Sequence, residues 1–240
     1  MYYQLIGDAN QNTMVFLHGW GTDSSSFRGV LSLLPKNNWR YLLIDFPGFG
    51  ESPEPIRDYT VYDYASEVVG LLKKLNIANA VIMGHSFGGR IAVVIGARYS
   101  EYVKKLILVD SAGLVMTRGI GYKIKVWSYK LTKRLVGCGL LKGGLKQSGS
   151  ADYRALKSDV MRKTFINVVN QDLLLEAKKI KAETIIIWGK NDKDTPLKMG
   201  VKFNKVISAS QLYVIENAGH YCFLDKIEDF VYILYDNIFI

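Results

Sequence analysis

Six apolar runs, separated by segments with helical periodicity, constrain the fold more than any other feature of this sequence. They are TMVFLHG (13–19), RYLLIDFPG (40–48), AVIMGHS (80–86), KLILVDSAG (105–113), TIIIWGK (184–190) and QLYVIENAGH (211–220). Their residues do not alternate between apolar and polar, which is typical of parallel strands covered by helices on both faces. The sequence therefore predicts an α/β fold, with a mostly parallel central sheet flanked by helices on both faces.

Three further segments between and after these runs have the spacing of helices. Residues 60–75 carry an apolar stripe at helical period, and Thr60 with Asp63 has the spacing of a capping box. Residues 197–207 and 226–238 are the other two predicted helices. Each of the three lies where a sheet of this kind needs a covering element.

The alternation is interrupted once, between residues 114 and 178. This stretch has no convincing strand, but it has several helical patterns, such as apolar residues three or four apart from Ile120 to Leu135. With 240 residues, 49% of them hydrophobic, the chain can bury one large core. We therefore expect one α/β core formed by residues 1–113 and 179–240, with residues 114–178 inserted as a helical cap.

The stretch Gly84-His85-Ser86-Phe87-Gly88 follows an apolar run and precedes a segment rich in small residues. It has the G-x-S-x-G pattern in the context strand, sharp turn, helix. Such a turn strains the serine backbone and lifts the hydroxyl above the sheet edge, and side chains two residues to either side would collide. We therefore predict that Ser86 is a nucleophile.

A serine hydroxyl needs a general base to act as a nucleophile at neutral pH. The chain has only three histidines. His18 ends the first apolar run, and His85 adjoins the serine in the turn, where its side chain should point away. His220 follows a strand end in a glycine-containing loop, where it can be presented over the sheet edge, and it is the predicted base.

The base in turn needs an acid that orients its imidazole ring. Asp192 lies just past the strand that ends at Trp188-Gly189, and it is the predicted acid. Asp194 and Asp110 also follow predicted strands, so both remain alternatives. An aspartate that is not used in this way could cap a helix or bind loop amides.

Acyl-transfer chemistry also needs donors for a developing oxyanion. The backbone N–H of Phe87, directly after the nucleophile, should supply one donor. The loop HGWG after the first apolar run should supply the other from Trp20. The same loop could also serve only to shape a turn.

Five motifs stand in the order typical of one superfamily: LHGWG, DFPGFGES, GHSFGG, WGKND and NAGH. Together they resemble the α/β-hydrolase superfamily, over nearly the whole chain, with the triad in the order Ser86, Asp192, His220. The resemblance implies the α/β-hydrolase fold, a cap over the active site that sets substrate choice, and no metal or organic cofactor. Gly19, His85, Trp127 and Tyr221 are the candidates for binding substrate.

The resemblance implies a serine hydrolase that cleaves carboxylic esters of small molecules through an acyl-enzyme. Dehalogenases and epoxide hydrolases of this superfamily use an aspartate nucleophile, whereas this chain has Ser86. C–C bond hydrolases resemble the layout more closely, but they commonly place tryptophan after the catalytic histidine, where this chain has Tyr221. A C–C hydrolase, a thioesterase and a non-catalytic ligand-binding member of the fold remain alternatives.

The formal net charge of +9 is concentrated in the predicted cap. Between residues 114 and 151 there is no Asp or Glu, and the basic residues are Arg118, Lys123, Lys125, Lys130, Lys133, Arg134, Lys142 and Lys146. This pattern fits either a solvated helical face or a surface for anionic membranes or substrates. No nucleic-acid-binding module is visible, so no nucleic-acid partner is expected.

Only Cys138 and Cys222 are present, without the spacing of metal ligands, so neither a disulfide framework nor a zinc site is predicted. The first apolar run is too short for a signal peptide or a membrane span. We therefore expect a cytoplasmic protein.

Overall fold

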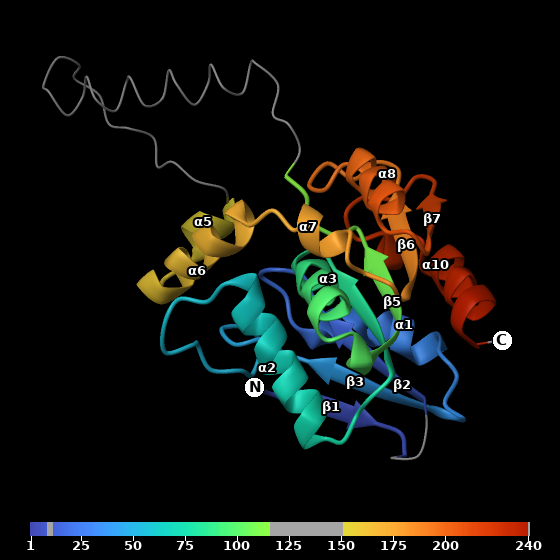
Figure 1. The fold of residues 1–240 in the computed structure, drawn as a ribbon, viewed down its shortest axis with the longest axis horizontal. Coiled ribbons are helices and arrows are strands. Elements are labelled where there is room, and N and C mark those ends of the chain that lie inside the picture. The colour runs from blue at the N-terminus through green and yellow to red at the C-terminus, as the bar shows by residue number, and fades with distance from the viewer. Residues whose placement is uncertain (9–11, 116–150, 240) are drawn as a thin grey trace, which may run out of the picture.

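The central feature of the fold is a seven-stranded sheet with the order β1-β3-β2-β4-β5-β6-β7. A computed structural model describes residues 1–8, 12–115 and 151–239 of the chain, and the account below is confined to them. All neighbouring strands are parallel except β1, which runs antiparallel to β3 at one edge. Figure 1 shows the order of the elements along the chain.

The six predicted apolar runs all form strands. These are β2 (Asn12–Leu17), β3 (Trp39–Ile44), β4 (Ala80–His85), β5 (Val103–Val109), β6 (Glu183–Gly189) and β7 (Ser210–Ile215). The seventh strand, β1 (Tyr3–Ile6), was not predicted. It is a short edge strand with no buried residue, and it therefore lacks the continuous apolar run that marks the central strands.

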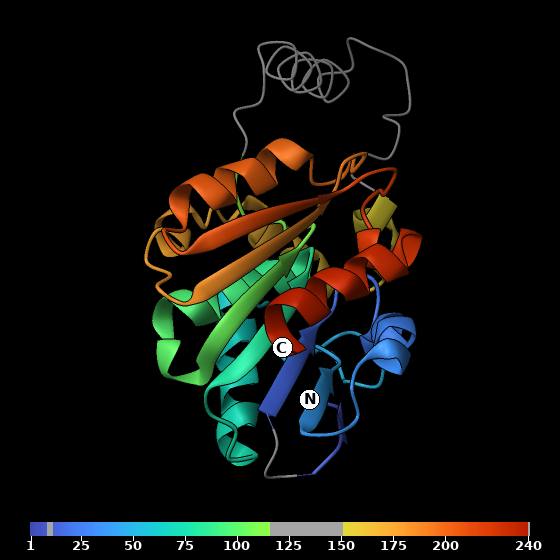
Figure 2. The same cartoon turned by 90° about the vertical axis from the view of Figure 1, so that its right-hand side faces the viewer.

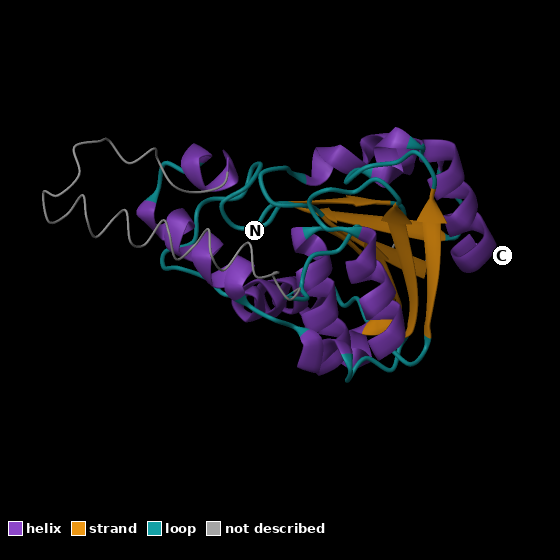
Figure 3. Ribbon diagram, turned by 90° about the horizontal axis from the view of Figure 1, so that it is seen from above, coloured by secondary structure: helices purple, strands orange, loops and turns teal. Residues whose placement is uncertain are grey.

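The helices form a layer on each face of the sheet (Figures 2 and 3). One layer contains α2 (Val61–Lys74), α3 (Phe87–Arg98), α7 (Leu174–Ala177) and α8 (Leu197–Val206), and the other contains α1 (Arg28–Leu33), α9 (Cys222–Asp225) and α10 (Ile227–Leu234). Alternate strand residues enter two separate hydrophobic clusters, so that Val15 packs on the first layer and Met14 on the second. Because both faces are buried, the central strands are apolar throughout, as the sequence predicted.

The predicted helices form close to their expected bounds. At α2, Thr60 N donates to Asp63 Oδ2 at 2.7 Å, and the N–H of Asp63 donates to Thr60 Oγ1 at 3.3 Å, which confirms the capping box. The predicted helix at 197–207 forms as α8. The one at 226–238 forms as α10, which is followed by a wider π-helical turn at Tyr235–Phe239.

Part of the predicted cap lies within the described residues. Its C-terminal part forms α5 (Ala151–Ala155), α6 (Asp159–Asn170) and α7, and α5 and α6 lie apart from the sheet, beside the start of α2 (Figure 1). Thr164 on α6 accepts a hydrogen bond from the N–H of Tyr59 at 2.9 Å, which ties α6 to the loop before α2. Residues 116–150 lie outside the described residues, so the bounds of the cap at 114–178 stay a prediction.

The first turn of α3 packs directly against the end of β2. A Cβ at Gly88 would lie 2.0 Å from the carbonyl oxygen of Leu17, and one at Gly84 would lie 2.4 Å from the carbonyl oxygen of Gly88. Real Cβ atoms do not approach backbone this closely, so both positions need glycine. The predicted collisions on either side of Ser86 are therefore confirmed.

Two glycine-to-alanine substitutions should change stability in opposite directions. Gly88→Ala should lower the free energy of unfolding by at least about 2–3 kcal/mol, because the new methyl group must displace backbone. Gly70→Ala, on the exposed face of α2 where nothing lies within 4 Å of the place the new methyl group would take, should raise it by about 0.5–1 kcal/mol. Urea denaturation of both variants and the unmodified protein measures this. Wild-type stability of Gly88→Ala would contradict the close approach.

Candidate active site

Ser86 sits in a sharp turn between β4 and α3. Its backbone has φ 50° and ψ −107°, in the left-handed half of conformational space that non-glycine residues rarely enter. The N–H of Ser86 donates to the carbonyl of Val109 at 3.1 Å, and its carbonyl accepts from the N–H of Ala112 at 3.1 Å. Two hydrogen bonds to the neighbouring segment, together with the close packing of Gly88, therefore hold the strained turn in place.

Three side chains from three different loops meet at this turn. His220 Nε2 lies 3.0 Å from Ser86 Oγ, and His220 Nδ1 lies 2.9 Å from Asp192 Oδ2. His220 follows β7 and Asp192 follows β6, so parallel strands bring their loops to the same edge of the sheet. With Asp192 ionised, Nδ1–H donates to the carboxylate and Nε2 is left to accept the hydroxyl proton of Ser86.

The electrostatics of this pair favour charge separation. Burial alone would raise the pKa of Asp192, but hydrogen bonds from His220 and Thr195 outweigh burial and hold that pKa below its usual range. Burial alone would lower the pKa of His220, but the hydrogen bond and the negative charge of Asp192 raise it above its ordinary value of 6.5. The arrangement therefore stabilises an imidazolium that has taken a proton from Ser86.

Thr195 is a supporting residue that was not predicted from the sequence. Its N–H donates to Asp192 Oδ1 at 2.9 Å, and its hydroxyl lies 2.6 Å from Asp192 Oδ2. The N–H of Asp194 also donates to Asp192 Oδ1, at 2.8 Å. The spacing D-x-D-T just before Pro196 was the available signal, because such loops commonly fold back on an aspartate side chain.

The two alternative acids occupy other places. Asp110 Oδ1 accepts the N–H of Gly189 at 2.8 Å, and Asp110 Oδ2 accepts the N–H of Cys222 at 3.2 Å, so its carboxyl joins β5, β6 and the start of α9. Burial raises the pKa of Asp110 to about 7. Asp194 lines the cavity beside His220 without a hydrogen bond to its ring. Asp192 is thus the carboxylate that meets the imidazole.

Trp20 and Phe87, the predicted oxyanion donors, both line the cavity in front of Ser86. Phe87 is the first residue of α3, where the N–H has no acceptor within the helix. No acceptor for either N–H occurs among residues 1–8, 12–115 and 151–239. Their side chains pack edge to face, with ring centroids 5.2 Å apart. Both N–H groups are therefore available to a ligand.

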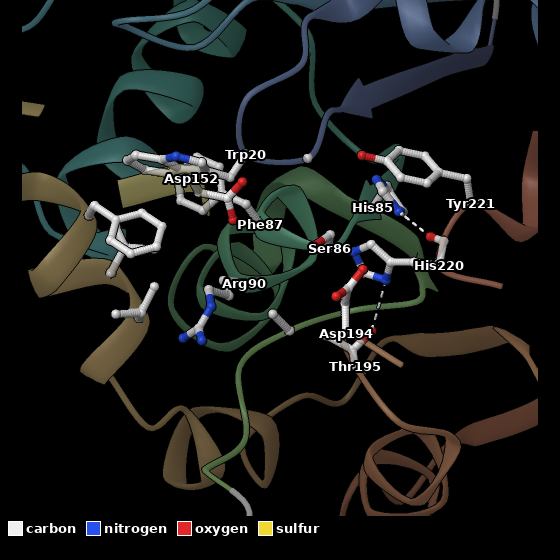
Figure 4. A pocket seen from close by; sticks show the side chains of 15 residues that line it. Trp20, His85, Ser86, Phe87, Arg90, Asp152, Asp194, Thr195, His220 and Tyr221 are labelled. Atoms are coloured by element: carbon white, nitrogen blue, oxygen red, sulfur yellow. Dashed lines mark hydrogen bonds between the residues drawn. The ribbon is translucent and has the colours of Figure 1, made fainter. Parts of the chain in front are cut away.

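The cavity has a volume of about 490 Å³. Of the predicted substrate-binding residues, Gly19, His85 and Tyr221 line it, whereas Trp127 lies outside the described residues. Figure 4 shows the labelled side chains around it, with His85 and Tyr221 on the same side as His220. Arg90 and Phe165 also line the cavity, and neither was predicted, because nothing in the local sequence marks the helix residues that face a cavity.

The remaining two histidines hold the loops of the site in place. His85 Nε2 lies 2.8 Å from the carbonyl oxygen of His220, and burial lowers the pKa of His85 to about 3, so that a neutral ring donates this bond. Burial lowers the pKa of His18 to about 4. His18 Nδ1 donates to the carbonyl of Gly19 at 2.7 Å, and its Nε2 accepts the N–H of Phe46 at 3.1 Å. The lowered pKa of each ring makes it a poor base at neutral pH.

A possible metal ligand set coincides with this site. The ligand atoms of Asp192, Asp194 and His220 lie within 4.8 Å of one another, which makes them a candidate group among the described residues. However, both oxygens of Asp192 already accept hydrogen bonds, from His220 and from the Asp194–Thr195 segment. The residues present therefore suit a proton relay better than a cation. The absence of a cofactor stays a prediction.

The fold and the turn at Ser86 define a class of protein, the α/β hydrolases. The sequence profile of the family described as the alpha/beta hydrolase fold matches residues 12–124. An AB hydrolase superfamily protein of Bacillus subtilis is 27% identical, and the match covers 90% of this chain and 87% of that protein. The structure of an esterase from Exiguobacterium antarcticum superposes with a TM-score of 0.77 at 28% identity, covering 98% of this chain and 94% of the other.

A third relative carries a different activity in its name. The 2-hydroxy-6-oxo-6-(2'-aminophenyl)hexa-2,4-dienoic acid hydrolase of Metapseudomonas resinovorans is 26% identical, over 90% of this chain and 80% of that protein. The chain thus belongs to the α/β-hydrolase superfamily, as the resemblance in its motifs implied, and it is a hydrolase of that fold.

Two expectations concern the surroundings of the protein. The basic part of the predicted cap, and with it the predicted contact with anionic membranes, falls on residues outside the described part of the chain. None of the helices in the described ranges is long and apolar enough to cross a membrane. The cytoplasmic location stays a prediction.

The raised pKa of His220 predicts the pH dependence of activity. The base is neutral only above that pKa, so kcat/KM should fall as the pH drops, with a midpoint above 6.5. In Asp192→Asn the attraction of the carboxylate is lost and burial remains, so the midpoint should move to lower pH while kcat falls by roughly 10³- to 10⁴-fold. Hydrolysis of a p-nitrophenyl ester from about pH 5 to about pH 9 measures both effects.

Asp194→Asn is the matched control for this experiment. It removes a neighbouring charge but no hydrogen bond to the imidazole ring, so it should leave kcat within about threefold of wild type. If the effect of Asp194→Asn equalled that of Asp192→Asn, the assignment of the acid would be wrong.

Proposed function

We propose that this protein is a serine hydrolase that cleaves carboxylic esters of small molecules through an acyl-enzyme. The observation that carries the proposal is the continuous hydrogen-bonded path from Ser86 Oγ through His220 to Asp192, at the edge of a cavity that also presents two available N–H groups. A nucleophile, a base, an orienting acid and an oxyanion site are the parts that acyl transfer needs.

The geometry supports a two-step reaction. In the first step Ser86 Oγ attacks the acyl carbon, its proton passes to His220 Nε2, and the carbonyl oxygen becomes an oxyanion near the N–H groups of Trp20 and Phe87. When the C–O bond to the alcohol breaks, His220 returns the proton to the leaving oxygen. Asp192 holds the imidazolium in the required orientation throughout.

The second step releases the acid. Water attacks the acyl carbon of the Ser86 ester, and His220 takes a proton from that water through the same nitrogen. The tetrahedral intermediate then expels Ser86 Oγ, which recovers its proton from His220. Each donor of an oxyanion site contributes about 3–4 kcal/mol to such intermediates in other enzymes.

C–C bond hydrolysis is the second candidate. It is favoured by the similarity to the dienoic acid hydrolase of Metapseudomonas resinovorans, which spans 90% of this chain. The residue after His220 is Tyr221 rather than the tryptophan common in C–C hydrolases. The ring of Tyr221 lies against His85, with centroids 4.9 Å apart, where it lines the same cavity.

Replacing the nucleophile should abolish turnover. Ser86→Ala should lower kcat for p-nitrophenyl esters, from acetyl to palmitoyl, by roughly 10⁴- to 10⁶-fold, because the acyl-enzyme can no longer form. The preferred chain length reports how deep the cavity is. The matched control is Ser66→Ala on the exposed face of α2, which should retain full activity.

Labelling of Ser86 by a fluorophosphonate separates the candidates. Labelling together with ester turnover supports the esterase. Labelling without ester turnover favours C–C bond hydrolysis, and turnover of a dienoate substrate then tests that activity. If the protein showed no labelling and no turnover, that result would contradict a serine hydrolase. A ligand-binding role would then remain.

A further inference from the structure

Arg90 lies one helical turn beyond the nucleophile on α3, and its side chain lines the same cavity (Figure 4). Side chains four positions apart on a helix have Cβ atoms about 5–6 Å apart, so a ligand bonded to Ser86 comes within reach of the guanidinium. Apolar side chains also line this cavity, from Ala112 after β5 and from Val168 and Val169 on α6. A cation therefore lines the same cavity as the Ser86 hydroxyl.

The partly buried guanidinium of Arg90 has few hydrogen-bond partners in the protein. Nη1 of Arg90 donates to the carbonyl of Gln171 at 2.8 Å, which leaves most of its five N–H donors for other partners. No carboxylate in the described residues lies within 4.0 Å of it. By contrast Arg98, two turns further along the same helix, pairs with Glu176 at 3.0 Å.

The acidic residue whose charge acts on Arg90, Asp172, does so from beyond the 4.0 Å of an ion pair. Its Oδ1 accepts the N–H of Val115 at 3.2 Å and the N–H of Leu174 at 3.3 Å. Residues 116–150 contain no Asp or Glu, so that segment has no side-chain carboxylate to offer. Burial lowers the pKa of Arg90 to about 10, so the group is still a cation at neutral pH.

A partly buried cation without a counter-charge costs stability unless a ligand supplies that charge. We propose that Arg90 binds a carboxylate of the substrate, so that the enzyme prefers acyl compounds that carry a carboxylate a few bonds from the reacting carbonyl. This inference rests on the proposed function, since it names the substrate class of the same site.

The surroundings of Arg90 favour a planar monoanion. A guanidinium forms two parallel hydrogen bonds with a carboxylate, and Arg90 is the one lysine or arginine among the described residues that line the cavity, so it can balance one negative charge. Asp152 and Asp194 line other parts of the cavity, and Figure 4 shows Asp194 beside His220. These two carboxylates would repel a substrate bound in the reverse orientation.

The test compares two pairs of esters that differ in a carboxylate. In the first pair the acyl chain carries it: mono-p-nitrophenyl adipate against p-nitrophenyl hexanoate. In the second pair the leaving group carries it: 4-acetoxybenzoate against phenyl acetate. Rates with Ser86→Ala are subtracted as background. Wild type should prefer the charged member of at least one pair, expressed as kcat/KM.

Arg90→Met should remove that preference. The kcat/KM for the favoured charged ester should fall by about 10- to 100-fold, whereas the value for its neutral partner should change by less than about threefold. Arg90→Lys should restore part of the preference, since it keeps the charge but not the planar fork. The matched control is Arg98→Met on the same helix, which should leave the preference unchanged.

Two results would overturn the inference. One is an equal loss on all four esters in Arg90→Met, which would mean that Arg90 only supports α6 through Gln171. The other is a wild-type preference for the neutral member of both pairs.

A binding measurement keeps this inference separate from the proposed function. Hexanoate and adipate anions should slow fluorophosphonate labelling of Ser86 in wild type, and this protection should be weaker by about 10-fold in Arg90→Met. Protection without turnover of any ester would sustain the anion site and reject ester hydrolysis. Ester turnover with protection that does not depend on Arg90 would sustain the hydrolase and reject the anion site.

Discussion

The contact between the first turn of α3 and the end of β2 fixes the geometry on which the rest of the site depends. A Cβ at position 88 would lie only 2.0 Å from the Leu17 carbonyl oxygen, so only glycine allows the helix to start this close to the sheet. This approach forces Ser86 into a backbone conformation with φ 50°, and it sets the first N–H of α3 beside the cavity. One packing constraint therefore places the Ser86 hydroxyl, the N–H of Phe87 and, one turn later, Arg90.

The loops around this turn are held by buried polar groups that all have partners. Within the described ranges, no buried side-chain nitrogen or oxygen atom lacks a hydrogen bond. His85 donates a hydrogen bond to the carbonyl of His220, and Thr195 donates one to the carboxylate of Asp192, so both residues of the His220–Asp192 pair are held in position by a neighbour. Dipoles that are oriented before the substrate arrives need no reorganisation during reaction, which is the main source of electrostatic stabilisation in enzymes.

The sequence predicted the sheet and the turn well because both leave local signals. Central strands buried on two faces are apolar throughout, and a turn without room for Cβ atoms must contain glycine. It favoured Asp192 as the acid but left Asp110 and Asp194 open, since all three follow strand ends and only the distance to His220 separates them. The position of Arg90 in the cavity could not be predicted from the segment GGRIAVV, because whether a helical arginine has an acidic partner depends on segments distant in the chain.

Arg90 differs in kind from the buried acidic groups of the site. Asp192 and Asp110 are each surrounded by donors from the protein itself, so their loops are complete without a ligand. Arg90 has one backbone carbonyl, and its charge is balanced by no described carboxylate within ion-pair distance. Natural proteins tolerate such local costs mainly where function requires them. Arg90 is therefore where the site is least complete by itself, and where a substrate adds most to the interactions that the protein already makes.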